Sequence, residues 1–265
     1  MHSGSLGGGG AFMNDFDRRQ SRMILDAISD FRQSRDPDEM WSHVHKSLAP
    51  FGVGGLWYGF EMMPQSGSYW RDHKSGLMLE SLRSGYVEAK IATGMADADF
   101  YYQAAKCNPA PIIWGDLSLS DDADEQERRS FEVDCDFGIL TGATLPASFA
   151  DGFGASAFSV HTPDLSFAGF DRMWRENGEA IRQIACAFDI CMREDHMPDF
   201  FPLSPREQEI LLRLTEGLRP QQIAFLLSLH EGTVEKHIES ARRKLKAATV
   251  TQAVATALIF GLIAP

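Results

Sequence analysis

One stretch decides the fold of the C-terminal quarter of the chain: Leu203–Gly217, which reads LSPREQEILLRLTEG. Ser204 can cap a helix through its hydroxyl, Pro205 has the φ angle of a first helical residue, and Glu207 stands where it completes a capping box. The apolar positions that follow recur at helical spacing: Ile210, Leu211 and Leu214. Gly217 suits the left-handed conformation that ends a helix. The stretch therefore predicts a helix with one buried face.

Two further short helices are predicted downstream, one from about Pro220 and one after the turn at residues 228–232. The apolar face of the last one is formed by Val234, Ile238, Ala241 and Leu245. Its opposite face is polar, and we expect it to contact DNA through Thr233, Glu235, Lys236, Glu239, Ser240, Arg242, Arg243 and Lys244. Three short helices joined by a tight turn favour a helix-turn-helix unit over a solvated helix in another small bundle.

The same segment resembles the LuxR-type helix-turn-helix signature along its whole length. The matching residues are Leu203–Glu207, Glu216–Gly217, Ile223–Ala224, Thr233–Val234, His237, Lys244–Leu245, Gln252–Ala255 and Gly261–Ile263. The resemblance implies an all-α module of four helices whose third helix enters double-stranded DNA. It also implies that the fourth helix, about Thr251 to Gly261, helps to form a homodimer, and that His237 braces the module.

Two outward positions of the third helix depart from the family pattern because they are acidic, Glu235 and Glu239. A carboxylate can accept a hydrogen bond from the cytosine amino group, but phosphate repels it. Thr251 also stands where the family usually has an Arg that contacts phosphate. The sequence therefore predicts an unusual base preference and weak non-specific binding, and it leaves open a dimerising antagonist that seldom binds DNA.

Charge divides the chain into two parts. Residues 203–265 carry a net charge of +2, whereas the rest carries −14. An acidic part of this kind does not bind DNA or an anionic membrane by itself, so we expect it to be a sensor. With 265 residues, the chain accommodates a disordered leader (1–12, with Met13 as the natural start), a sensor domain (13–193), a linker (194–202) and a DNA-binding domain (203–265).

Several other classes of protein are disfavoured by the sequence. Neither a signal peptide nor a run of about 20 apolar residues is present, and the four cysteines lack metal or redox spacing, so we expect a cytoplasmic protein with reduced, mostly buried thiols and without membrane contact. The scattered histidines and the acidic residues 121–125 match neither a nucleophile nor a metal-ligand pattern, which predicts no enzyme, no metal and no cofactor. The alternating parallel units of a phosphorylated receiver domain are also missing.

The predicted elements of the acidic part mix helices and strands. Helices are expected at residues 15–32, 37–48, 76–91, 121–133 and 170–193, and strands at 51–62, 67–73, 138–145 and 153–162. This order favours an antiparallel sheet between helices. We therefore predict an α+β chain: an N-terminal α-β-α sandwich followed by an all-α helix-turn-helix domain.

This order also resembles the ligand-binding domain of the quorum-sensing branch of the LuxR family. Asp99, Trp114 and Gly142 keep the family intervals of 15 and 28 residues, and Ser159 falls where the family has a pocket hydroxyl. The resemblance implies that Asp99 accepts the amide hydrogen of an acyl-homoserine lactone. Trp57 and Tyr58, on the first predicted strand, are further candidates for the wall of the pocket. The predicted ligand-binding residues are thus Trp57, Tyr58, Tyr86, Lys90, Asp99, Tyr101, Trp114 and Ser159. Without the spacing, Trp114 and the tyrosines would be interpreted as ordinary core and Asp99 as a loop residue.

The pocket departs from the family at three positions. Tyr86 and Lys90 occupy positions at which the family has Trp and Tyr, and Phe100 stands where it usually has Pro. A buried Lys needs an anionic partner or a neutral state. Either a local gap shifts the alignment, bringing Asp97 into the pocket, or the ligand is not an ordinary acyl-homoserine lactone. The sequence thus predicts a DNA-binding transcriptional regulator that senses a small molecule, with a ligand-independent or partner-gated regulator as the alternative.

Overall fold

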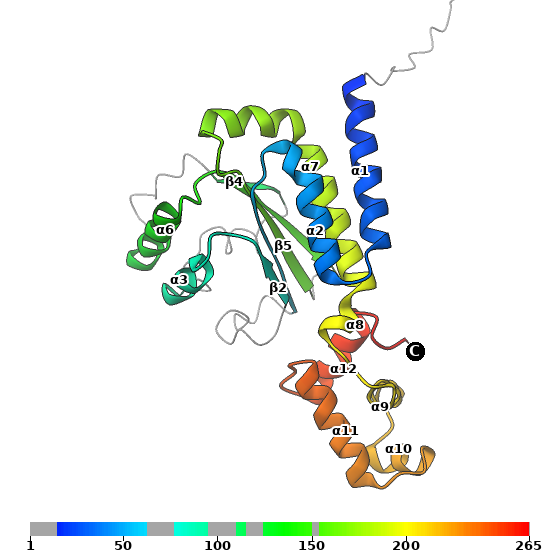
Figure 1. Cartoon of the computed structure of the whole chain (residues 1–265). Helices are drawn as coiled ribbons and strands as arrows, with labels where there is room; N and C mark the ends of the chain where they lie inside the picture. Colours follow the sequence, from blue (N-terminus) through cyan, green and yellow to red (C-terminus); the bar gives the residue numbers. More distant parts are fainter. Residues whose placement is uncertain (1–14, 63–76, 95–109, 115–123, 150–153, 265) are drawn as a thin grey trace, which may run out of the picture.

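The computed structural model describes residues 15–62, 77–94, 110–114, 124–149 and 154–264. In the N-terminal part these residues form α1 (Asp15–Gln33), α2 (Pro37–Leu48), the 3-10 turn η1 (Ala49–Phe51), β1 (Gly55–Met62), β2 (Leu77–Glu80), α3 (Tyr86–Ala92), β3 (Ile112–Trp114), α6 (Glu125–Phe137), β4 (Gly142–Phe149), β5 (Gly154–His161) and α7 (Phe167–Asp195). The short α8 (Met197–Phe200) leads to α9 (Pro205–Thr215), α10 (Pro220–Leu226), α11 (Glu231–Lys244) and α12 (Val250–Ile259). Figure 1 shows the two parts joined through α8.

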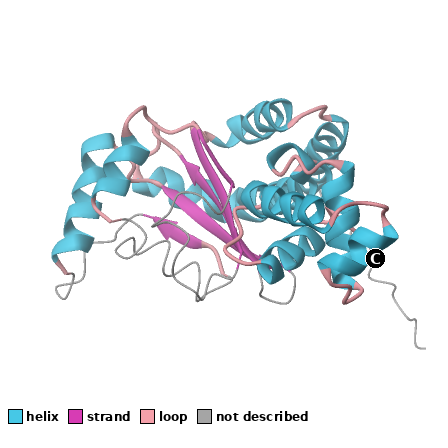
Figure 2. Ribbon diagram, turned by 90° about the horizontal axis from the view of Figure 1, so that it is seen from below, coloured by secondary structure: helices cyan, strands magenta, loops and turns pink. Residues whose placement is uncertain are grey.

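The N-terminal part is an α-β-α sandwich. Its sheet has the order β2-β1-β5-β4-β3, and all neighbouring strands run antiparallel. Helices α1, α2 and α7 cover one face, while α3 and α6 lie on the other side, as Figure 2 shows from below. The predicted α+β class and the antiparallel sheet between helices are therefore confirmed.

Strand alternation assigns each side chain to one face of the sheet. Trp57 on β1 is paired with Ser159 on β5, which in turn is paired with Thr144 on β4, so these three residues share the face toward α3 and α6. Tyr58 is paired with Phe158, and both point toward the opposite layer of helices, where Phe188 of α7 packs 5.1 Å from the Tyr58 ring. The main core thus lies between the sheet and α1, α2 and α7.

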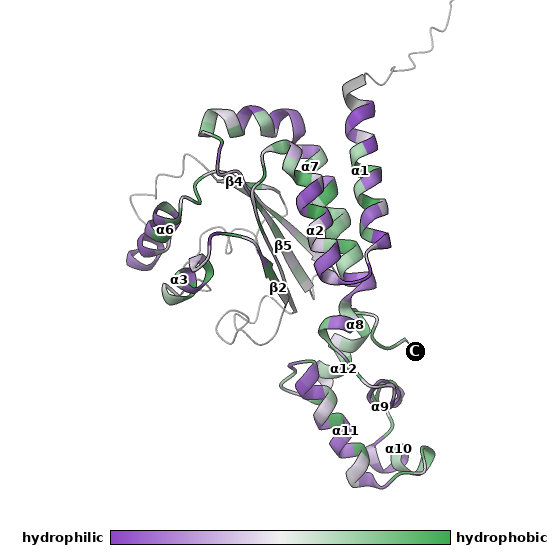
Figure 3. Cartoon of the chain, in the orientation of Figure 1, coloured by the Kyte–Doolittle hydropathy of each residue, from purple (hydrophilic) through white to green (hydrophobic). Residues whose placement is uncertain are grey.

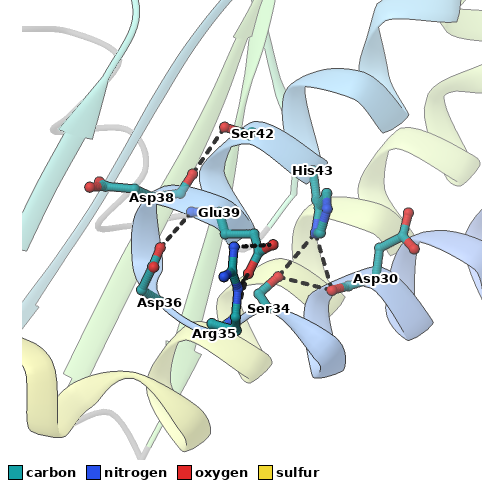
Figure 4. A network of polar contacts seen from close by, with 8 residues as sticks. All are labelled: Asp30, Ser34, Arg35, Asp36, Asp38, Glu39, Ser42 and His43. Atoms are coloured by element: carbon teal, nitrogen blue, oxygen red, sulfur yellow. Dashed lines mark hydrogen bonds and ion pairs between the residues drawn. The ribbon is translucent and has the colours of Figure 1, made fainter.

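The turn between α1 and α2 is fixed by polar contacts. The Asp36 carboxylate caps α2 by accepting from the Glu39 backbone N–H at 2.8 Å, and the Arg35 guanidinium pairs with the Glu39 carboxylate (Figure 4). His43 Nδ1 lies 3.2 Å from the Asp30 carbonyl oxygen and so ties α2 to the end of α1. These contacts hold α1 and α2 antiparallel on top of α7.

The C-terminal part has the predicted local structure. Ser204 and Glu207 form a complete capping box at the start of α9, and Gly217 follows the helix with φ = +80°. A small separate core joins α9, α10 and α11 through Ile210, Ile223, Ala224, Val234 and Ile238. Hydrophilic residues cover much of the rest of α11 (Figure 3). The second part is thus a helix-turn-helix unit followed by α12.

An aromatic contact links the two parts. The Phe260 ring, at the end of α12, lies 4.9 Å from the Phe60 ring of β1 and stacks on Phe201 at 5.5 Å. Phe60, Phe201 and Phe260 are all almost completely buried. The end of the C-terminal part therefore packs directly against the sheet of the N-terminal part.

Several predicted element boundaries are wrong. The expected helix at 76–91 is strand β2 followed by a turn and α3, because residues 77–80 pair with β1. Residues 51–54 precede β1, and β4 begins at Gly142 instead of 138. The expected linker, 194–202, contains the end of α7 and the whole of α8. The expected strand at 67–73 and the leader at 1–12 lie outside the described residues. Cys135 and Cys186 are exposed, contrary to expectation, because both lie on outer faces of helices.

Candidate functional site

The sheet face toward α3 and α6 carries a chain of hydrogen bonds between buried side chains. Trp114 Nε1 donates to Thr144 Oγ1 at 2.9 Å, and Thr144 Oγ1 lies 3.0 Å from Ser159 Oγ. The indole N–H and the two hydroxyls provide three hydrogens, but the chain contains only two hydrogen bonds. One hydroxyl hydrogen therefore remains without an acceptor among the described residues. Beside it, the ring of Trp57 is half-buried on the same face.

Gly142 allows Trp114 and the backbone of Val160 to approach the start of β4 closely. A Cβ atom at Gly142 would lie 2.1 Å from the Val160 carbonyl oxygen and 2.6 Å from the Trp114 ring. Only glycine permits this close approach, so the Trp114 ring can lie directly against the start of β4. The interval between Trp114 and Gly142, noted in the sequence, thus corresponds to a direct pairing of β3 with β4.

A second polar cluster lies between α3 and α6. Lys90 is only 2% exposed, and its ammonium contacts the Asp134 carboxylate at 3.0 Å as well as the Ser130 hydroxyl and carbonyl oxygens. The Tyr86 hydroxyl donates to Asp134 Oδ1 at 2.7 Å. The anionic partner that a buried Lys90 requires is therefore Asp134, which the sequence analysis did not identify. Helical spacing of Ser130 and Asp134, four residues apart on α6, was the available signal.

These contacts use the hydrogen-bond donors that Tyr86 and Lys90 could otherwise offer to a ligand. Three acceptors already surround the three hydrogens of the Lys90 ammonium, and the hydroxyl hydrogen of Tyr86 is donated to Asp134. Both residues therefore join α3 to α6 instead of presenting free donors. The hydroxyl of Tyr86, a predicted ligand-binding residue, is thus engaged within the protein.

Three of the other predicted ligand-binding residues have different outcomes. Tyr58 lies on the opposite face from Trp57, because neighbouring residues of a strand point to opposite sides. Its hydroxyl donates to Asp189 Oδ1 at 2.9 Å within the helical core, so Tyr58 is a core residue and not a pocket wall. Asp99 and Tyr101 lie outside the described residues. The face that the structure brings together is thus formed by Trp57, Trp114, Thr144 and Ser159.

The predicted DNA-facing residues of α11 divide into two groups. Glu235, Lys236, Glu239 and Arg243 are exposed, Thr233 and Arg242 are partly exposed, and Arg242 contacts the Glu239 carboxylate at 3.4 Å. By contrast, Lys244 donates to Glu207 Oε2 at 2.7 Å, and Ser240 also bonds to this carboxylate. The side chains of Lys244 and Ser240 are therefore bound within the module.

Glu207 forms an ion pair that joins two helices of this module. Its burial disfavours the ionised form, but the Lys244 ammonium, the Ser204 backbone N–H and the nearby Ser hydroxyls outweigh burial and lower the pKa of Glu207 to about 2. The carboxylate is thus ionised at neutral pH and joins the start of α9 to the end of α11. The capping-box pattern predicted Glu207 at the helix start, but not its partner Lys244, which is 37 residues away.

Within the described ranges, none of the helices combines the length and the apolar character needed to cross a membrane. The longest of them, α7, has a broad apolar face that packs into the core and a charged outer face.

Comparison with known families matches both parts of the chain. Residues 36–189 match the autoinducer binding domain, and residues 202–257 match the luxR family of bacterial regulatory proteins. The two matches follow one another in the same order as the sandwich and the helix-turn-helix unit.

Three relatives are transcriptional regulators. RpaR of Rhodopseudomonas palustris, a quorum sensing-dependent regulator, is 33% identical over 58% of this chain and 61% of its own length. RhlR of Pseudomonas aeruginosa, a quorum-sensing regulator, is 30% identical over 68% of each chain. SolR of Ralstonia solanacearum, a transcriptional activator, is 25% identical over 90% of this chain and 98% of its own length.

Solved structures show the same fold. SdiA in complex with octanoyl-rac-glycerol superposes with a TM-score of 0.58 at 17% identity, over 95% of this chain and 98% of that one. A second crystal structure of Escherichia coli SdiA gives a TM-score of 0.55 at 18% identity, over 95% and 100% of the two chains. The two family matches and the identity to RhlR establish that this chain belongs to the LuxR family of quorum-sensing transcriptional regulators, with an autoinducer-binding domain and a DNA-binding helix-turn-helix domain.

Proposed function

We propose that this regulator binds an acyl-homoserine lactone or a closely related signal against the sheet face of Trp57, Trp114, Thr144 and Ser159. The single observation that carries this proposal is the hydroxyl hydrogen of the Trp114–Thr144–Ser159 chain that has no acceptor in the described part of the protein. A buried donor without a partner is costly, and a ligand carbonyl oxygen would satisfy it. Asp99 is proposed to accept the amide hydrogen of the same ligand.

The same proposal extends to assembly and location. A homodimer would place two copies of α11 in successive major grooves of double-stranded DNA, about one helical turn apart. Residues 13–193 would act as the sensor domain, 194–202 as the linker and 203–265 as the DNA-binding domain. Because its partner is chromosomal DNA, the proposed location is the cytoplasm.

Ligand binding is tested on the full chain purified from cells grown with and without acyl-homoserine lactones. Mass spectrometry of solvent extracts should detect one lactone per subunit in the protein from supplemented cells. Ser159→Ala should weaken retention up to about tenfold, which corresponds to the net value of one hydrogen bond. Ser156→Ala is a matched control, since Ser156 is equally buried on β5 but points to the opposite face. Equal retention by both variants would contradict the proposed site.

The competing hypothesis is a regulator that works without a lactone. It is favoured by one observation: the Tyr86 hydroxyl and the Lys90 ammonium, at positions where the family contacts its ligand, are bound to Asp134 instead. Under this hypothesis, stable protein of unchanged oligomeric state is obtained from cells that lack lactones, and extracts of supplemented cells contain none. Size-exclusion chromatography with light scattering, run beside the extraction, separates the two cases.

A further inference from the structure

The exposed face of α11 carries two carboxylates one helical turn apart. Val234 and Ile238 are buried against α9 and α10, and Ala241 is buried in the main core, which together fix the rotation of α11 about its axis. Glu235 and Glu239 each follow one of these buried positions, and both are exposed. Residues four apart lie on the same side of a helix, so the two carboxylates project together from the module.

Their spacing along the helix matches the spacing of bases. Four residues advance an α-helix by about 6 Å, and stacked base pairs are about 3.4 Å apart. A helix lying along the major groove would therefore bring Glu235 and Glu239 opposite base pairs roughly two steps apart. Both residues lie in the first two-thirds of α11, and it is the N-terminal residues of a recognition helix that contact base edges.

Electrostatics restricts what these carboxylates can contact in DNA. Phosphates repel them, and an ionised carboxylate carries no hydrogen, so it can only accept hydrogen bonds. In the major groove the exposed donors are the amino groups of cytosine and adenine, and Glu is suited to the N4 amino group of cytosine. At adenine, the N7 acceptor beside the amino group disfavours a second carboxylate oxygen.

The neighbouring cations support this orientation. Arg242 contacts the Glu239 carboxylate at 3.4 Å and so restrains it. Lys236 and Arg243 are exposed and, being seven residues apart, lie on one side of α11, where they can contact phosphates along one wall of the groove. Lys244 is bound to Glu207 and cannot move toward Glu239 without breaking that contact. On α11, cations can therefore contact the DNA phosphates while the two carboxylates face the bases.

We propose that Glu235 and Glu239 are sequence-reading residues that each select a cytosine in the half-site of the operator. This inference rests on the proposed binding of α11 in the major groove and deepens it by naming the bases. Glutamine at the same position would form the paired contact that recognises adenine. The Glu235→Gln and Glu239→Gln variants should therefore prefer adenine where the wild-type protein prefers cytosine, each variant at one position of the half-site.

The test is selection of duplexes from a randomised DNA pool by the full-length protein, followed by sequencing. Wild-type protein should enrich cytosine at two positions per half-site, and replacing either cytosine should weaken binding about tenfold in a gel shift. Glu235→Gln should enrich adenine at one of the positions, and Glu235→Ala should lose preference there. Glu209→Gln is the matched control, because it removes the same charge from a partly exposed residue of α9, outside α11.

Thermal unfolding shows that the variants are folded, since exposed substitutions change stability by less than about 0.5 kcal/mol. An enriched motif that stays the same in wild-type protein and in both glutamine variants would overturn the assignment of the bases while leaving the proposed DNA binding intact. A wild-type pool without any enriched sequence would overturn both. A motif that also changes in Glu209→Gln would show a general charge effect and would likewise overturn the assignment.

Discussion

The buried Lys90–Asp134 pair allows a quantitative prediction about the sensor domain. Lys90 is 2% exposed and Asp134 is 5% exposed, and their charged atoms lie 3.0 Å apart between α3 and α6. Removing the ammonium by Lys90→Met leaves the carboxylate of Asp134 buried without this cation, although the Tyr86 hydroxyl still donates to it. Breaking a buried pair in this way costs about 3–5 kcal/mol.

The structure also predicts that removing both charges restores most of this loss. In Lys90→Met/Asp134→Leu no charge remains to be desolvated, and the apolar side chains fill a similar volume. We expect the free energy of unfolding of the double variant to return to within about 1 kcal/mol of wild type. The single variants should unfold about 6–20 °C earlier than wild type, if each kcal/mol shifts the midpoint by about 2–4 °C.

The assay is urea and thermal unfolding of the full chain, followed by circular dichroism. Arg129→Met is the control, because Arg129 forms an exposed ion pair with Glu125 on the same helix α6. Exposed pairs contribute about 1 kcal/mol or less, so this variant should resemble wild type. If Lys90→Met costs no more than Arg129→Met, or if the double variant is as unstable as the singles, the argument that Lys90 joins α3 to α6 is refuted.

Three further predictions follow from single residues. The pKa of Glu207 is lowered to about 2, so the ionised carboxylate contributes its full stabilisation above the ordinary pKa of Glu and loses it as the pH falls toward 2. The difference in melting temperature between wild type and Glu207→Gln should therefore shrink between pH 5 and pH 2. Gly142→Ala should destabilise the chain by about 3 kcal/mol or more and shift the fluorescence of Trp114, because its Cβ would overlap the Trp114 ring; unchanged emission and melting would contradict this. Phe260→Ala should cost about 3–5 kcal/mol and, by opening the contact to Phe60, should speed proteolysis between the two domains; wild-type cleavage rates would argue against a structural link.

The helix-turn-helix part could be predicted almost completely from the sequence because its signals are local. The capping box at Ser204, the glycine at 217 and the helical recurrence of apolar residues each act within one or two turns, and the structure has all of them. The sensor part was predicted less well, because strands need partners. Residues 77–80 have helix-compatible composition, yet they form β2, since β1 offers them an edge.

The candidate site shows the same limit more sharply. The interval between Trp114 and Gly142 indicated a family pattern, and the structure explains it by one strand pairing. The hydrogen-bond chain through Thr144 was missed, because it depends on the registers of β3 with β4 and of β4 with β5. Asp134 could not be assigned to Lys90 from the sequence, because the two residues are 44 positions apart and meet only through helix packing.

Strand β1 connects the two functions of the chain. Trp57 lies on the proposed ligand face, whereas Phe60, three residues later, points to the opposite side and contacts Phe260 at the end of α12. A ligand can shift the DNA-binding domain only if its affinity differs between two arrangements of the protein. Since Phe60 and Phe260 are both almost completely buried, β1 cannot move relative to α12 without exposing one of these rings or moving the whole domain with it. The contact therefore couples any shift of β1 to α12, which gives the proposed ligand a physical route to the helix-turn-helix domain.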